Sequence, residues 1–328
     1  MNDELGEIME HRIHLKGTDF DVSPFAFGTV KAGLAWDGAD ADRILNTYVD
    51  QGGNLIDTAR IYYDWEGTEK GRSERVIGDW FRRCKRRNQV VLMTKGGHPP
   101  KEAMHISRLS MEDMRYDLEK SLQALGTDHI DIYFYHRDDR TRSVGELIEQ
   151  MEVFRNEGKI LYYGCSNWST GRMIEADAYA KQNGLTGFVA NQNLYNIAAR
   201  HMQPFEDDTM VSVDQEAISF YKTANNTPMP YFGICSGFFH NLMARGEDAV
   251  KDSCYYTPEN LKLAKGIQQL CKKYGCSITQ VLLGFFYIQE YPIVPLVGFS
   301  KIPQLEDALN SVNIPFTRED YVEIGGIE

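Results

Sequence analysis

Short apolar runs alternate with longer amphipathic segments along most of the chain. The apolar runs have the composition of strands in a parallel sheet, where both faces are buried. We predict strands at residues 25–27, 55–57, 90–94, 130–135, 160–164, 188–190, 231–234 and 293–297. Apolar residues recur at helical spacing between these runs. The predicted helices are 39–51, 73–87, 111–125, 147–156, 172–182, 214–222, 258–274, 278–289 and 304–310.

Capping residues support several of these helix boundaries. Ser73, Ser110 and Thr257 stand at predicted helix starts, where a hydroxyl can accept a hydrogen bond from a free backbone N–H group. Pro258 follows at the first helical position, which proline favours. Residues 277–280 have the sequence of a capping box.

The alternation predicts an α/β fold. Eight strand and helix pairs follow one another without a linker rich in Pro, Gly or Ser, and such alternation needs a parallel sheet. We predict one domain over residues 1–328, a (β/α)8 TIM barrel, with an open doubly wound sheet as the alternative. The absence of a Gly-x-Gly-x-x-Gly motif after the early strands favours the barrel. Residues 12–15 and 20–22 flank a turn, which predicts an N-terminal β-hairpin before the repeat.

Composition and charge exclude several classes of protein. Hydrophobic residues make up 42% and charged residues 25%, as in an ordinary globular protein. The net charge of −12 argues against a nucleic-acid partner, which needs a basic face. Six cysteines without a CxxC pair indicate reduced thiols rather than a disulfide framework or a zinc site. Without a long apolar run or a signal-like start, we expect a cytoplasmic protein with no membrane partner.

Ionisable side chains follow the ends of three successive predicted strands. They are Asp57, with Tyr62 five residues later, then Lys95 and His136. Each has an ordinary structural explanation: a helix cap, a packed aromatic ring, a solvated lysine and a buried histidine. In a (β/α)8 barrel, however, the working groups stand at the carboxyl ends of the strands. We therefore expect these four side chains to share one pocket.

Together the four residues could deliver a proton. A phenol with a pKa near 10 is a weak acid at neutral pH, and a neighbouring ammonium group lowers that pKa. Lys95 could supply the charge, and Asp57 could hold Lys95 through an ion pair. His136 would orient a carbonyl group or share the proton path with Tyr62. This hypothesis predicts a proton donor aimed at a carbonyl oxygen.

Seven segments in this order resemble the aldo-keto reductase family over nearly the whole chain. They are residues 53–59 with Tyr62, 71–74, 94–95, 125–126, 131–133 with His136, 164–168 and 191–195. The resemblance implies reduction of an aldehyde or ketone by NADPH, without a metal. It also implies that Tyr62 is the general acid, that Lys95 and Asp57 tune it, and that His136 orients the substrate. Tyr62 matches rather than Tyr63, because the family tyrosine stands five residues after the aspartate.

The resemblance also implies a cofactor site. Ser166, Asn167 and Gln192 would hold the nicotinamide carboxamide, and Tyr231 would stack against the ring. Residues 295–301 match the segment that holds the 2′-phosphate.

The residues expected at that adenosine end are Gly298, Ser300, Lys301, Gln304 and Asp307. The usual arginine of the family is absent, and Asp307 stands where a glutamate is common. The resemblance therefore favours NADP(H) and leaves NAD(H) as an alternative.

The loops after Tyr62 and His136 are expected at the pocket mouth. Trp65 and Trp168 would offer apolar faces to a substrate, while Arg137 and Asp139 would offer hydrogen bonds suited to a polyol. A sugar or keto-sugar is one hypothesis for the substrate. In the alternative, Arg137 and Asp139 pair with each other at a solvated rim. A different function, an NADP-binding redox sensor with little turnover, also stays open, and the sequence does not determine the oligomeric state.

Overall fold

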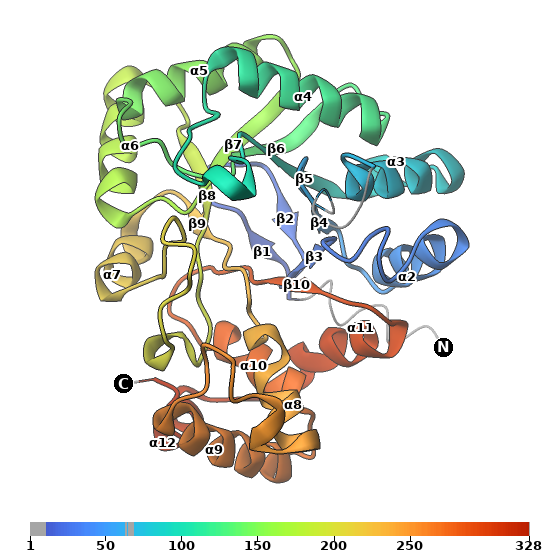
Figure 1. The fold of residues 1–328 in the computed structure, drawn as a ribbon, viewed down its shortest axis with the longest axis vertical. Coiled ribbons are helices and arrows are strands. Elements are labelled where there is room, and N and C mark those ends of the chain that lie inside the picture. The colour runs from blue at the N-terminus through green and yellow to red at the C-terminus, as the bar shows by residue number, and fades with distance from the viewer. Residues whose placement is uncertain (1–10, 63, 65–68, 328) are drawn as a thin grey trace.

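The computed structural model describes residues 11–62, 64 and 69–327, and its centre is one parallel sheet (Figure 1). The eight strands run in the order β10-β3-β4-β5-β6-β7-β8-β9. Their bounds are β3 Ala26–Gly28, β4 Leu55–Asp57, β5 Val91–Gly96, β6 Ile130–Tyr135, β7 Ile160–Ser166, β8 Phe188–Gln192, β9 Thr227–Pro228 and β10 Leu296–Gly298. Consecutive pairing of parallel strands is the order of a (β/α)8 barrel.

Backbone hydrogen bonds join the two edges of this sheet. Val294 N donates to Pro228 O at 3.0 Å, and Leu296 N donates to Pro230 O at 2.8 Å. These bonds link the segment of β9 to the segment of β10, so the sheet curls into the predicted barrel. The strand side chains that face inward form a separate apolar cluster at the centre of the barrel.

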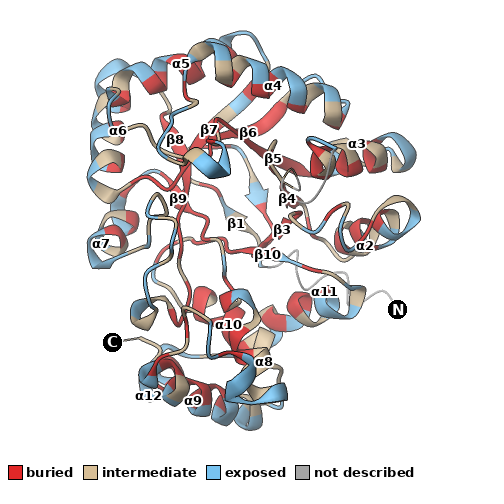
Figure 2. Ribbon diagram, viewed as in Figure 1, coloured by how far each residue is buried: buried red, intermediate tan, exposed pale blue. Residues whose placement is uncertain are grey.

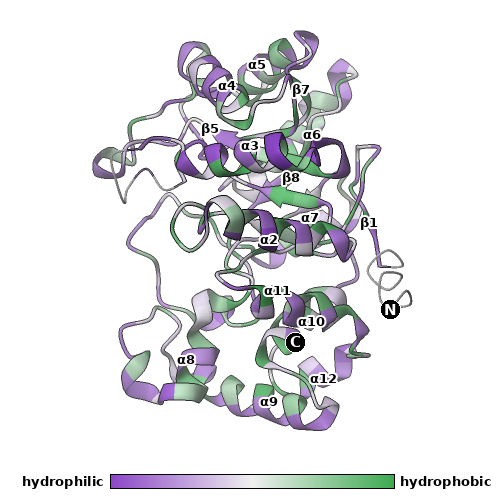
Figure 3. Ribbon diagram, turned by 90° about the vertical axis from the view of Figure 1, so that its right-hand side faces the viewer, coloured by the Kyte–Doolittle hydropathy of each residue, from purple (hydrophilic) through white to green (hydrophobic). Residues whose placement is uncertain are grey.

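Helices cover the outside of the sheet, and their apolar sides pack against it. Figure 2 shows buried residues on the strands and on the helix sides that face them. In Figure 3 hydrophilic and hydrophobic residues alternate around the helices, the pattern expected of amphipathic helices. The longer helices are α2 Gly38–Asp50, α3 Arg72–Cys84, α4 Met111–Leu125, α5 Val144–Asn156, α6 Thr170–Asn183, α7 Gln215–Thr223, α9 Pro258–Tyr274 and α10 Ile278–Tyr287. Among the described residues, no helix is long and apolar enough to span a bilayer.

The predicted hairpin is present and closes one end of the barrel. Its strands are β1 Ile13–His14 and β2 Asp21–Val22, paired antiparallel. Leu15 and Val22 are fully buried and belong to the apolar cluster inside the barrel. Asn54, directly before β4, accepts a hydrogen bond from Ser23 N at 2.8 Å. The hairpin therefore lies at the amino ends of the strands and leaves the carboxyl ends open.

Most predicted elements are present, with a few corrections. β4, β6, α4 and α9 begin and end where the sequence predicts. The predicted strand at 231–234 is wrong: the strand is β9, and Phe232 adopts φ 60°, which no strand residue has. Ser73 is not a helix cap, because α3 begins one residue earlier and Ser73 Oγ donates to Thr29 O. The helix predicted at 304–310 is α11 Ile302–Leu309, and two short helices were not predicted: α8 Phe238–Arg245 and α12 Arg318–Glu323.

Candidate active site

Three of the four predicted ionisable residues form one hydrogen-bonded group at the carboxyl ends of β4 and β5. Lys95 Nζ donates to both carboxylate oxygens of Asp57, at 2.8 and 2.7 Å, and to Thr58 O at 2.8 Å. The same ammonium lies 3.0 Å from the hydroxyl of Tyr62. Tyr62 OH is 3.4 Å from Asp57 Oδ2. The phenol, the ammonium and the carboxylate therefore touch one another.

The ion pair of Asp57 and Lys95 is almost completely buried, with 1% and 2% of the two side chains exposed. Burial lowers the pKa of the Lys95 ammonium, but the charge of Asp57 and the contact with Tyr62 outweigh it, so the pKa is raised. A buried charge is costly unless it is paired and hydrogen-bonded, and here both requirements are met. Lys95 thus stays charged next to the phenol.

The direction of the Tyr62 pKa differs from the sequence-based prediction. Burial is the largest effect and raises the pKa of the phenol, Lys95 lowers it, and Asp57 raises it again. The net result is a pKa above the ordinary value of 10. The expected lowering by Lys95 is present but is smaller than the cost of burying a phenolate. Tyr62 is therefore fully protonated at neutral pH, as a proton donor must be.

His136 follows β6 and completes the group. Its ring meets the Tyr62 ring edge to face, with 6.0 Å between the ring centroids. Burial lowers the pKa of His136 well below its ordinary value, and the nearby His98, Lys95 and Arg137 act in the same direction. The imidazole is therefore neutral at neutral pH. A neutral imidazole can donate one hydrogen bond without carrying a charge into the pocket.

Four predicted cofactor residues continue the network: Ser166 and Asn167 at the end of β7, Gln192 in β8, and Tyr231 after β9. Ser166 Oγ donates to Gln192 O at 2.8 Å, and Asn167 Nδ2 donates to Ser166 Oγ at 3.0 Å. Tyr231 OH donates to Asn167 Oδ1 at 2.7 Å. Gln192 Nε2 donates to Asp57 Oδ1 at 2.9 Å, while Gln192 Oε1 accepts no hydrogen bond within the described residues. Ser166, Asn167, Gln192 and Tyr231 form an amide cluster, and Gln192 connects it to the ion pair of Asp57 and Lys95.

A cavity of about 700 Å³ opens above these residues. All four ionisable residues and Ser166, Asn167, Gln192, Tyr231 and Gly298 line it, so the structure brings them to one space. Sequence reasoning did not identify the apolar part of the wall, which consists of Val30, Ile61, Met210, Phe232, Ile234 and Leu296. It also missed His98, which lines the same cavity.

The segment 231–237 is another part of the wall that the sequence did not reveal. Phe232, Cys235, Ser236 and Gly237 all have positive φ between 50° and 77°. Hydrogen bonds within the segment hold this shape: Cys235 N donates to Phe232 O at 2.8 Å, and Gly237 N donates to Ile234 O at 3.0 Å. The two glycines of this segment were the available signal, but its apolar residues led to the prediction of a strand.

Of the residues predicted for the adenosine end, Gly298 lines this cavity, whereas Ser300, Lys301, Gln304 and Asp307 do not line it. Gln304 Oε1 accepts hydrogen bonds from Ser300 N at 2.9 Å and from Lys301 N at 3.1 Å, which fixes the start of α11. Asp307 Oδ2 accepts a hydrogen bond from Ser277 Oγ, the capping residue of α10, at 2.8 Å. Gln304 and Asp307 therefore have structural partners, whereas the side chain of Lys301 is exposed.

Neither of the two tryptophans predicted to contact the substrate is among the described residues that line the cavity. Trp65 lies outside the described residues. Trp168 is fully buried behind the strands, where its ring stacks with Tyr135 and meets Phe188 edge to face at 4.8 Å. The prediction that Trp168 offers a face to the substrate is wrong, because its indole is enclosed by these rings and by Arg172.

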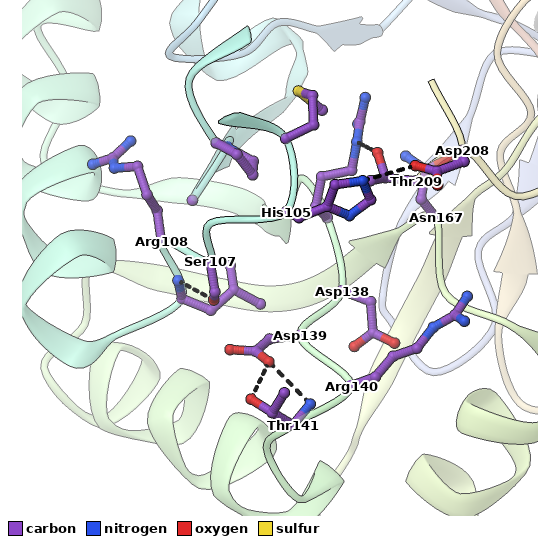
Figure 4. Close-up of a pocket in the computed structure, with 15 residues that line it drawn as sticks. His105, Ser107, Arg108, Asp138, Asp139, Arg140, Thr141, Asn167, Asp208 and Thr209 are labelled. Carbon is purple, nitrogen blue, oxygen red and sulfur yellow. Dashed lines mark hydrogen bonds and ion pairs between the residues drawn. The ribbon is translucent and has the colours of Figure 1, made fainter. Parts of the chain in front are cut away.

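Arg137 and Asp139 do not pair with each other. Arg137 forms an ion pair with Asp207 at 3.0 Å and donates to Thr209 Oγ1 at 2.9 Å. Asp139 accepts hydrogen bonds from the backbone and the hydroxyl of Thr141, and it lines a separate polar pocket of about 290 Å³ (Figure 4). Arg137 lines both this pocket and the larger cavity. Of the two residues, only Arg137 is positioned to meet a substrate in the main cavity.

Comparison with known proteins fits this geometry. The model of the aldo/keto reductase family matches residues 24–328. An aryl-alcohol dehydrogenase of Pestalotiopsis microspora is 27% identical over 96% of the chain and 81% of the relative. A norsolorinic acid reductase of Aspergillus flavus is 26% identical over 97% and 81%. An uncharacterized oxidoreductase, YrpG, of Bacillus subtilis is 29% identical over 93% and 92%.

Proposed function

The chain belongs to the aldo/keto reductase family, and we propose that it reduces an aldehyde or ketone to an alcohol with NADPH, with Tyr62 as the proton donor. The contact between the Lys95 ammonium and the Tyr62 hydroxyl, 3.0 Å apart at the floor of the cavity, carries this proposal. A buried phenol beside a fixed positive charge can release a proton because the phenolate that remains is stabilised.

Each residue of the group has a distinct task in this mechanism. When bound, the nicotinamide cofactor supplies the hydride. The neutral His136 donates a hydrogen bond to the substrate carbonyl and orients it. Tyr62 gives its hydroxyl proton to the carbonyl oxygen as negative charge develops there. Lys95 stabilises the resulting phenolate, and Asp57 holds Lys95 in place through both carboxylate oxygens.

The polar groups beside this centre suit a nicotinamide carboxamide. Gln192 uses Nε2 for Asp57 and keeps Oε1 as an acceptor for an amide N–H group. Ser166 and Asn167 lie next to it, and Tyr231 lines the same wall of the cavity. Lys301 and Ser300 favour NADPH over NADH, because an ammonium and a hydroxyl can both bind a 2′-phosphate.

Two classes of substrate are candidates for the cavity. Its apolar wall, together with relatives named for aryl alcohols, favours an aromatic carbonyl compound. The polar pocket beside Arg137 favours a sugar or keto-sugar that extends into it. Comparing kcat/KM for substituted benzaldehydes and for keto-sugars decides between the two. Much faster reduction of simple aromatic aldehydes rules out the sugar.

Replacement of the proton donor tests the proposed reaction. Tyr62→Phe removes only the hydroxyl, and we expect carbonyl reduction to fall by about 10²–10⁴-fold, the usual contribution of a general acid. NADPH affinity, measured by fluorescence titration, is expected to stay within a factor of about two, because the phenyl ring remains. Tyr116→Phe, at an exposed position on α4, is the matched control and should change neither value.

Two outcomes contradict the proposal. Full activity of Tyr62→Phe would mean that another acid, such as Tyr63, protonates the substrate. The second outcome comes from stopped-flow mixing of the wild-type complex with NADPH and carbonyl compounds. Tight NADPH binding without carbonyl-dependent oxidation of NADPH would indicate a redox sensor with little turnover.

A further inference from the structure

A second histidine lies beside the catalytic one and has no role in the mechanism above. His98 stands three residues after Lys95, in the loop that follows β5. Its ring meets the ring of His136 edge to face, with 4.7 Å between the centroids. His98 lines the same cavity as the four ionisable residues. Any substrate held by His136 therefore lies next to His98.

The loop that carries His98 is fixed by buried polar contacts. Gly97 has φ 72°, which side-chain-bearing residues rarely adopt, and its N–H group donates to Asp117 Oδ2 at 2.9 Å. Asp117 is buried and pairs with Arg108 through two bonds of 3.1 Å. Arg108 also donates to the backbone oxygen of His98 at 3.3 Å. The position of the His98 backbone is thus set before any ligand binds.

The hydrogen bonding of His98 determines its chemical character. Nδ1 lies 2.6 Å from the backbone oxygen of Pro99. A carbonyl oxygen only accepts, so Nδ1 carries the proton and Nε2 has a free lone pair. Burial, helped by Arg137, lowers the pKa of His98 to about 4, which keeps the ring neutral at neutral pH. Nε2 has no hydrogen-bond partner within the described residues, so it can accept a hydrogen bond from a ligand.

We propose that His98 accepts a hydrogen bond from a hydroxyl group on the carbon next to the substrate carbonyl, which makes α-hydroxy aldehydes and α-hydroxy ketones the substrate class. This inference rests on the proposed carbonyl reduction. Neighbouring imidazoles, one donating to the carbonyl oxygen and one accepting from the hydroxyl, match two oxygens on adjacent carbons. A site built around an acceptor discriminates against a substrate that leaves it unpaired. The proposal applies equally to aromatic and aliphatic hydroxy ketones.

Two pairs of compounds of equal size test the proposal. Hydroxyacetone and butanone differ by a hydroxyl in place of a methyl group, and so do 2-hydroxyacetophenone and propiophenone. The quantity of interest is the ratio of kcat/KM within each pair. Because the hydroxyl also changes the intrinsic reactivity of the carbonyl, the ratio for the wild type is compared with the ratio for His98→Leu, which removes the acceptor.

We expect His98→Leu to lower the ratio in both pairs by at least about tenfold, mainly through a higher KM for the hydroxy ketone. Reduction of butanone and propiophenone should stay within about threefold of the wild type. His98→Gln, whose amide oxygen can replace Nε2, should recover most of the preference. His14→Leu, at an exposed position on the hairpin at the other end of the barrel, is the control and should leave the ratios unchanged.

Three results separate the possible failures. An unchanged ratio in His98→Leu overturns the role of His98. An equal loss for both members of a pair also overturns it, since His98 would then only support His136. Failure of the wild type to oxidise NADPH or NADH with any of the four ketones counts against the proposed function itself. If His98→Leu does not fold, as judged by its Tm, the shorter His98→Asn replaces it and should lose the preference that His98→Gln retains.

Discussion

At the scale of single residues, Asp57 is the centre of the site. Its two carboxylate oxygens accept from Lys95, from Gln192 and from Tyr62, so it links the proton donor to the amide cluster. The sequence predicted the first of these contacts because parallel strands bring their carboxyl ends together. It could not predict the bond to Gln192, which is 135 residues away and depends on the curvature of the closed barrel.

The buried ion pair makes a testable contribution to stability. Lys95→Met leaves the Asp57 carboxylate buried without its partner, and we expect it to lower the free energy of unfolding by about 3–5 kcal/mol. Combining Lys95→Met with Asp57→Asn removes both charges and should restore most of the loss. Urea denaturation measures each value.

The matched control is Lys70→Met, because Lys70 is exposed and its ammonium lies as far as 4.0 Å from the carboxylate of its partner Asp64. Such a surface pair contributes less than about 1 kcal/mol. Additive losses in the double variant of Asp57 and Lys95 would show that the two charges do not interact as the geometry requires.

The pKa directions predict the pH dependence of carbonyl reduction. Tyr62 must be protonated, and because its pKa is raised, activity is lost only as the pH rises through a value above the ordinary one. His136 must be neutral, and because its pKa is lowered, it becomes charged only under acidic conditions. We therefore expect kcat/KM to be constant from about pH 6.5 to about pH 10, the ordinary pKa values of the two groups. An inflection near neutral pH that disappears in a His136 variant would contradict this.

At the scale of helices and loops, most local sequence signals were reliable, although the cap at Ser73 and the strand at 231–234 were wrong, and contacts between distant residues left no signal. Ser110, Thr257 and Ser277 cap their helices as predicted, because a cap depends only on the next three residues. The partner of Arg137 is Asp207, 70 residues away, so no local pattern could identify it. The burial of Trp168 has the same cause, since the rings around it come from other strands.

The start of α11 is the element that should distinguish NADPH from NADH. Lys301→Ala removes an exposed ammonium next to the capped turn, and we expect NADPH affinity to fall by about tenfold, the value of one charged hydrogen bond. NADH affinity should change by less than about twofold. Lys262→Ala removes the same charge from an exposed position on α9 and serves as the control. Fluorescence titration with both cofactors measures the difference, and equal losses for the two would place the 2′-phosphate elsewhere.

At the scale of the whole molecule, the barrel places residues that stabilise the fold at the amino ends of the strands and the candidate site at their carboxyl ends. The alternation of strands and helices was sufficient to predict the architecture, since few folds other than a closed barrel accommodate eight such pairs. The hairpin was predicted as a pair of strands. Its role in closing one end of the barrel could not be predicted, because the residues it packs against come from distant parts of the chain. Its buried residues complete the apolar interior at the amino ends of the strands, opposite the candidate site.

This separation predicts the effect of truncating the hairpin side chain that enters the barrel. Leu15 is fully buried in the interior cluster, so Leu15→Ala leaves a cavity and should lower the free energy of unfolding by about 2–5 kcal/mol. NADPH affinity and kcat at 25 °C should stay close to wild type, because the folded population is still large and the site lies at the other end of the strands. Leu34→Ala, at a leucine that is 52% exposed, should cost less than about 0.5 kcal/mol. A Leu15→Ala protein of normal stability but weakened cofactor binding would show that the hairpin acts on the site instead of closing the barrel.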